Sequence, residues 1–136
     1  MKFKIIIMAL VAFFIYSSVS MAAEITLAWD ANSETDLAGY KLYYDKDVSG
    51  PEYIGIGINE GDSPIEIPLF DLSDTQNPQF KVTGLTTGTY YFVVTAYDNV
   101  GNESGYSNEV NPTVDTSAPS NPSGLNVTVI VHVVVE

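Results

Sequence analysis

The chain has 136 residues, and its 17 acidic residues outnumber five basic ones, so the formal net charge at pH 7 is −12. A surface this acidic is repelled by phosphate backbones and anionic lipid headgroups, so we expect no nucleic-acid partner. There is no Cys and one His, His132 near the C-terminus. These counts exclude a disulfide framework, a lipidated Cys anchor and a Ser-His-Asp arrangement inside the main domain.

Residues 1–23 have the pattern of a secretory signal peptide. Two lysines precede the apolar run IIIMALVAFFIY at 5–16, and small residues follow at 17–23. The run is shorter than the roughly 20 residues that a membrane-spanning helix needs. We therefore expect a secreted protein, extracellular or periplasmic, that is not inserted in a membrane after cleavage. An uncleaved N-terminal anchor is the alternative.

The rest of the chain has the alternating pattern of β-strands. Strands are predicted in chain order at 24–30, 39–45, 52–58, 65–72, 79–85, 90–98 and 106–110. Pro68 marks the fourth of these as an edge or irregular strand, because proline cannot donate to a strand ladder. No segment has sustained helical periodicity. Short strands separated by frequent turns are typical of an antiparallel β-sandwich.

Several features of residues 24–112 are informative together. They are Trp29 in the first predicted strand, the run GYKLYY at 39–44, the stretch from Leu85 to Tyr90, and ESGYSNEV at 103–110. These features resemble a fibronectin type III domain of the kind found in secreted bacterial multidomain proteins. The resemblance implies an immunoglobulin-like β-sandwich. With the alternation, it assigns these residues to the core: Trp29, Tyr40, Leu42, Leu85, Tyr90, Phe92 and Val94.

The resemblance also implies a tyrosine corner, in which a tyrosine hydroxyl bonds to the backbone of the preceding loop. Tyr90 and Tyr91 are both candidates. We favour Tyr90, because strand alternation then directs Val94 and Ala96 into the core. The chain departs from the family here, since Thr87 stands where the family usually has proline.

Two more departures concern the length of the chain around the domain. Residues 59–78 are longer than the usual connection, which predicts an extra edge strand or a flap, and no first strand precedes Glu24. Residues 113–122 read as a Pro/Ser/Thr-rich linker, and residues 123–136 resemble the first strand of a second module. Three interpretations stay open: a piece of a tandem array, a tail that folds back on the domain, or self-association through the tail strand.

Acidic residues are the candidates for chemistry. Glycoside hydrolysis needs two carboxylates across a cleft, and loop-borne acids on a small sandwich predict none, so we expect no enzyme. Two loops have spaced oxygen ligands and are weak calcium candidates. The residues are Asp30, Asn32, Asp36, Asp98 and Asn102. The first loop lacks the glycine and the final glutamate of an EF-hand, and solvated turn residues are the alternative.

Tyr43, Tyr91 and Val93 are predicted to share the outer face of one sheet, where they could contact a ligand. Simple cross-strand pairing is the alternative. The expected function is a non-catalytic secreted module that serves as a spacer or in adhesion and protein binding. The alternative is a carbohydrate-binding or calcium-stiffened accessory module of an extracellular polysaccharide-degrading system. The partner would then be a protein or an extracellular polysaccharide.

Overall fold

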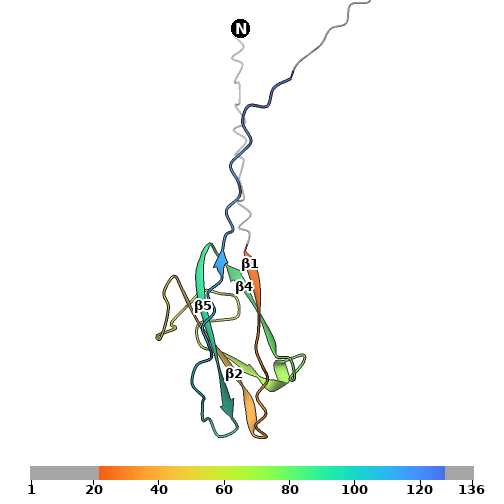
Figure 1. Cartoon of the computed structure of the whole chain (residues 1–136), viewed down its shortest axis with the longest axis vertical. Coiled ribbons are helices and arrows are strands. Elements are labelled where there is room, and N and C mark those ends of the chain that lie inside the picture. Colours follow the sequence, from red (N-terminus) through yellow and green to blue (C-terminus); the bar gives the residue numbers. More distant parts are fainter. Residues whose placement is uncertain (1–21, 128–136) are drawn as a thin grey trace, which may run out of the picture.

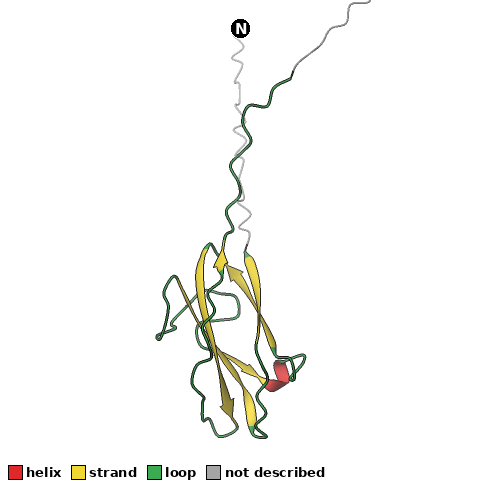
Figure 2. Cartoon of the chain, in the orientation of Figure 1, coloured by secondary structure: helices red, strands yellow, loops and turns green. Residues whose placement is uncertain are grey.

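The computed structural model describes residues 22–127. It contains six strands and one short 3-10 helix (Figures 1 and 2). They are β1 (Ala23–Ala28), β2 (Leu37–Lys46), β3 (Ile65–Pro68), η1 (Leu69–Asp71), β4 (Gln79–Leu85), β5 (Gly88–Asp98) and β6 (Thr113–Val114). One sheet pairs β1 with β4, and the other has the order β3-β2-β5-β6. All pairs are antiparallel, which confirms the predicted all-β sandwich.

The core lies between the two sheets. Tyr40, Leu42 and Tyr44 of β2 are at most 1% exposed, as are Val82 and Leu85 of β4. The predicted inner face of β5 is also confirmed. Two of its residues, Tyr90 and Phe92, are buried, and two more, Val94 and Ala96, pack against the core while staying partly exposed. Period-2 alternation therefore placed the core correctly, because successive side chains of a strand point to opposite faces.

The two aromatic landmarks of the sequence occupy the two ends of this core. Trp29 follows β1 directly and meets Tyr40 edge-to-face, with ring centroids 5.1 Å apart. At the other end, the Tyr90 hydroxyl accepts a hydrogen bond from the backbone N–H of Thr86. This bond confirms Tyr90 rather than Tyr91 as the corner residue. Pro68 ends β3, which lies at the edge of the larger sheet as predicted.

The predicted strand at 52–58 is wrong. The segment makes only an isolated bridge between Ile58 and Gly61, and it belongs to a long loop beside the end of β2. The Gly55 N–H donates to the Tyr44 carbonyl at 2.8 Å, which ties the loop to β2. Alternate glycines remove the side chains that a strand would pack, and Gly57 has φ +89°, which breaks the extended conformation.

The predicted strand at 106–110 is also wrong, although the segment does follow β5. The N–H groups of Ser104, Ser107 and Val110 donate to the carbonyls of Ala96, Val94 and Phe92. Successive hydrogen bonds are therefore three residues apart along the segment but two residues apart along β5. The hydroxyl of Ser104 accepts the N–H of Ala96, and that of Ser107 accepts the N–H of Val94. Because serine hydroxyls replace backbone carbonyls, the segment is not a regular strand.

Among residues 22–127, β1 pairs with β4 alone, so no strand follows its other edge. Residues 115–127 extend away from the sandwich without forming a strand (Figure 1). Residues 1–21 of the predicted signal peptide, 1–23, lie outside the described residues. The remainder of the predicted tail strand, 128–136 with His132, lies outside them as well.

Candidate functional site

The outer face of the larger sheet carries a covered layer of polar and aromatic contacts. Val93 is 2% exposed and Thr95 is 3% exposed, although both lie on the outward side of β5. The segment after β5 covers them. Of the predicted ligand residues, Val93 is therefore buried beneath other side chains, whereas Tyr43 and Tyr91 are partly exposed.

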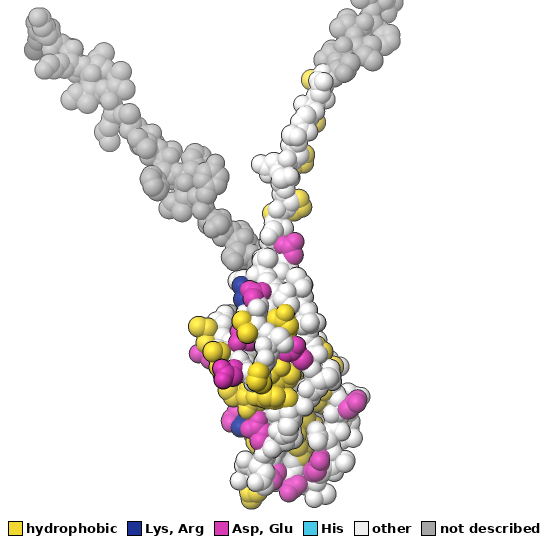
Figure 3. Space-filling model, turned by 60° about the vertical axis from the view of Figure 1, so that its left-hand side comes forward, with side chains coloured by type: hydrophobic (Ala, Val, Ile, Leu, Met, Phe, Trp, Pro, Cys, Tyr) yellow, Lys and Arg dark blue, Asp and Glu magenta, His cyan; other side chains and the backbone are white. Residues whose placement is uncertain are grey.

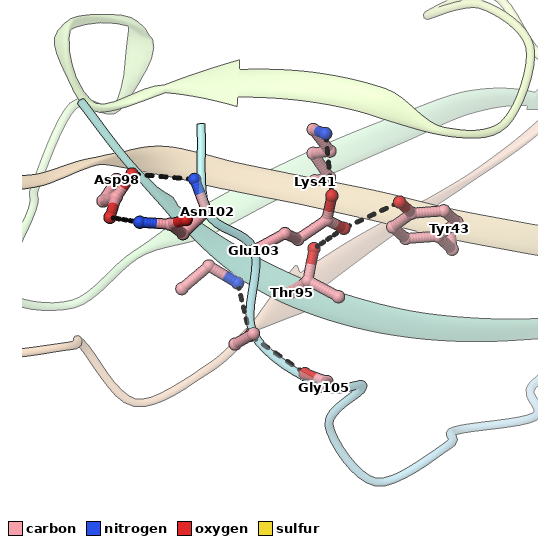
Figure 4. A network of polar contacts seen from close by, with 9 residues as sticks. Lys41, Tyr43, Thr95, Asp98, Asn102, Glu103 and Gly105 are labelled. Atoms are coloured by element: carbon pink, nitrogen blue, oxygen red, sulfur yellow. Dashed lines mark hydrogen bonds and ion pairs between the residues drawn. The ribbon is translucent and has the colours of Figure 1, made fainter. Parts of the chain in front are cut away.

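Glu103 organises one half of this layer (Figure 4). Its carboxylate accepts hydrogen bonds from Lys41 Nζ at 2.8 Å, Tyr43 Oη at 2.7 Å and Thr95 Oγ1 at 2.7 Å. Burial alone would raise the pKa of Glu103, but these three donors outweigh it and lower the pKa. Burial, followed by the bond to Glu103, raises the pKa of Tyr43 to about 12. The group is thus a closed network that ties β2, β5 and the following segment together.

Glu109 organises the other half. It accepts hydrogen bonds from Tyr53 Oη at 2.7 Å and Ser49 Oγ at 3.0 Å, both from the long loop after β2. The Tyr53 bond is the main cause that lowers the pKa of Glu109. Burial and the same bond raise the pKa of Tyr53 to about 12. Glu109 therefore anchors the loop against the segment that follows β5.

Tyr106 bridges the two halves. Its ring lies 5.1 Å from that of Tyr43 at 71° and 5.3 Å from that of Tyr53 at 85°, measured between centroids. These edge-to-face pairs are a stable arrangement for aromatic side chains. They do not form a coplanar row of rings. The cluster therefore stiffens the surface and offers no flat aromatic platform.

Exposed apolar side chains lie beside this cluster, on the loop after β2. Val48, Ile54 and Ile56 are 57%, 72% and 76% exposed, and they line one shallow hollow. We call these three residues the apolar loop. In Figure 3, hydrophobic side chains gather on this face with acidic side chains around them. Contiguous apolar surface with a polar rim is typical of a protein interaction site.

The side chain of Asp98, one of the calcium candidates, accepts hydrogen bonds within its own turn. Asp98 accepts hydrogen bonds from the backbone N–H groups of Val100 and Asn102, both at 2.9 Å, and from the Asn102 amide at 2.7 Å. The Asn102 amide is the largest cause of a lowered Asp98 pKa. The Asn99 N–H donates to the Asp36 carbonyl, so the two loops are neighbours.

The other candidates add no ligand cluster. Asn32 donates its backbone N–H to the Tyr40 hydroxyl. Asp30 lies two residues before Asn32, in the same connection between β1 and β2. Within residues 22–127, no three His, Cys, Asp or Glu side chains come together in a way that could hold a metal ion.

Sequence reasoning missed most of this surface. Glu103 lies between two predicted strands and Glu109 within one of them, and the partners Lys41, Tyr43 and Ser49 lie about 60 residues away in the chain, beyond the reach of periodicity. The exposure of the isoleucines in the apolar loop could have been predicted from the sequence. Isoleucines separated by glycines in IGIGI alternate like a strand, but glycine neighbours cannot supply the packing that would bury them.

Comparisons with profiles of protein families, with curated proteins and with solved structures found no match. In the part of the chain that the structure describes, no helix is long and apolar enough to cross a membrane.

Proposed function

We propose that the domain is a fibronectin type III-like sandwich. Three features support the assignment. The sheet orders β1-β4 and β3-β2-β5-β6 match the B-E and C′-C-F-G arrangement of such domains. Tyr90 forms the corner at the start of β5, and Trp29 packs on Tyr40 in the core. Sandwich folds host many activities, so the function rests on the surface and not on the fold.

The proposed function is that of a non-catalytic secreted module that binds another protein, in adhesion or as part of a larger extracellular assembly. The observation that carries it is the exposure of Ile54 and Ile56, at 72% and 76%. An exposed isoleucine contributes little to folding, whereas burying one fully in a complex stabilises it by about 1.5–3 kcal/mol. The hydrogen bond from Tyr53 to Glu109 holds the loop in place, which reduces the entropy lost on binding.

The carbohydrate-binding alternative is less well supported. Sugar rings stack on flat aromatic faces, and the rings of Tyr43, Tyr53 and Tyr106 cross at steep angles instead. Tyr43 also uses its hydroxyl to bond Glu103. A protein surface with its own apolar residues fits the apolar loop better.

Surface variants test the proposal. Ile54→Ser/Ile56→Ser is compared with Phe70→Ser, which removes an even more exposed apolar side chain, 86% exposed, from η1 on the other side of the sandwich (Figure 1). Binding to a panel of immobilised extracellular proteins is measured by interferometry. We expect the wild type and Phe70→Ser to bind a common partner and the double variant to lose it at least tenfold.

Other results would assign a different role. Binding on a glycan array that Tyr43→Ala abolishes would favour the carbohydrate-binding alternative. A wild type that binds neither proteins nor glycans would leave a spacer. Turnover of polymer substrates would overturn the non-catalytic assignment.

A further inference from the structure

A groove of about 500 Å³ runs between β1 and the segment after β5. Leu27 and Trp29 form one wall, and Ser107 and Val110 lie on the other. The inner face of β5 forms the floor. This floor is well covered at Phe92, which is 1% exposed, but only partly covered at Val94 and Ala96. The sandwich core is therefore open along this side.

Two observations indicate that the groove accommodates a β-strand. Among the described residues, the edge of β1 that faces away from β4 is unpaired, so alternate N–H and C=O groups along it have no strand partner. The indole N–H of Trp29, on the groove wall, is buried and has no hydrogen-bond partner. Buried N–H groups in proteins are nearly always paired. A strand beside β1 would supply backbone acceptors at this wall.

We propose that the groove receives the C-terminal strand of a second copy of the chain, the ten residues NVTVIVHVVV at 126–135. This stretch has no acidic or basic residue, and an uncharged β-branched strand left in water is a template for aggregation. Strand alternation gives it two different faces. One face consists of valines only: Val127, Val129, Val131, Val133 and Val135. The other face includes Thr128 and His132. The all-valine face suits the apolar floor, and the mixed face suits solvent.

The direction of the chain argues for a second copy. β6 leaves the sandwich at the end where β1 begins, and residues 115–127 continue away from it (Figure 1). A tail that turned back into its own groove would run parallel to β1, whereas every strand pair described here is antiparallel. A tail that enters the far end of the next copy runs antiparallel to that copy's β1.

This geometry has a consequence for assembly. Each copy donates one strand and receives one, through two different surfaces. Such a head-to-tail contact uses two different surfaces on each copy, so it produces either open chains or closed rings of molecules. The eleven residues at 115–125 reach about 36 Å when extended, which is enough to span from one copy to the next.

The first test measures the mass of the chain from residue 24 to 136 by light scattering over a range of concentrations. Val129→Asp/Val131→Asp places charge on the valine face of the tail. Thr128→Asp/His132→Asp adds the same charge to the opposite face and is the matched control. We expect the wild type and the control to form multiples of the chain mass, and the valine variant to stay monomeric. A wild type that is monomeric at every concentration, or a valine variant that still associates, would overturn the proposal.

The second test uses the absence of native cysteines. Thr26→Cys places a thiol on the exposed face of β1, and Thr128→Cys, Ile130→Cys or His132→Cys places one on the tail of a separate chain. We expect one of the three tail positions to form an interchain disulfide at least tenfold faster than the others, because a paired strand has one register. Equal rates at all three positions indicate unspecific aggregation. A disulfide that forms within a single chain carrying both thiols shows fold-back, and either result rejects the second copy as the occupant.

Discussion

The hydroxyl of Tyr90 accepts a hydrogen bond from the backbone N–H of Thr86 at 3.2 Å. Tyr90 is 4% exposed, and its ring stacks on that of Phe92 with centroids 6.0 Å apart. One side chain therefore joins the core of the larger sheet to the turn between β4 and β5. Because β4 belongs to the smaller sheet, this bond couples the two layers at their connection.

Removing that bond should lower stability. Tyr90→Phe keeps the ring but leaves the Thr86 N–H without its partner, which we expect to cost about 1–2 kcal/mol in the free energy of unfolding. Urea titration followed by fluorescence measures it. Tyr91→Phe is the control, because no hydrogen bond of the Tyr91 hydroxyl is seen among the described residues. If Tyr91→Phe costs as much as Tyr90→Phe, the corner is assigned to the wrong tyrosine.

The hydroxyls of Ser104 and Ser107, which accept hydrogen bonds from β5, should also contribute to the free energy of unfolding. Ser104→Ala and Ser107→Ala remove the acceptors of the Ala96 and Val94 N–H groups. We expect each to lower the free energy of unfolding by about 1 kcal/mol and to speed amide exchange at the freed N–H. Exposed Ser73→Ala should change neither quantity. Unchanged exchange at Val94 and Ala96 would show that the hydroxyls are not the acceptors.

Glu103 should contribute to stability in a pH-dependent way. Its pKa is lowered below 4.5 in the folded state. The stabilisation is therefore present above the unfolded-state pKa and is lost as pH falls through the folded-state pKa. Glu103→Gln should cost about 1–2 kcal/mol at pH 7 and should reduce the loss of stability below about pH 5. Melting curves from pH 7 to pH 3 measure both effects.

Glu24→Gln is the matched control for that experiment. Glu24 pairs with Lys81 at 3.0 Å, but both side chains are more than half exposed. Exposed pairs contribute about 0–1 kcal/mol. An equal cost for the two substitutions would mean that the hydrogen bonds of Glu103 to Tyr43 and Thr95 contribute nothing.

Gly55 should not tolerate a side chain. A Cβ at this position would clash with the ring of Tyr44, which is itself fully buried. Gly55→Ala should displace the loop from β2 and lower the free energy of unfolding by about 1–3 kcal/mol, as overpacking does. Gly105→Ala, which meets nothing within 4 Å, should be nearly neutral. Thermal unfolding of the two variants decides, and a neutral Gly55→Ala would show that the loop is loosely attached.

The errors in strand prediction have a common cause. Segments 52–58 and 106–110 both alternate or carry β-branched residues, so local pattern favours a strand in each. In the first, Gly55 packs against Tyr44 and Gly57 adopts positive φ. In the second, serine hydroxyls take over backbone hydrogen bonds. None of these effects appears in hydrophobic periodicity, because the Gly55 contact and the serine hydrogen bonds depend on residues of another strand, and the φ of Gly57 is a local backbone conformation.

The strands at the centre of the sandwich, their inward faces and the corner at Tyr90 could all be predicted before the structure was known. The strands and their faces follow from local alternation, whereas the corner was implied by the family resemblance, with alternation choosing Tyr90 over Tyr91. Tertiary structure alone decided that Val93 is covered, that Glu103 meets Lys41 and Tyr43 across about 60 residues, and that a groove opens beside β1. Contacts between distant segments form only when the sheets pack, and packing depends on the whole chain.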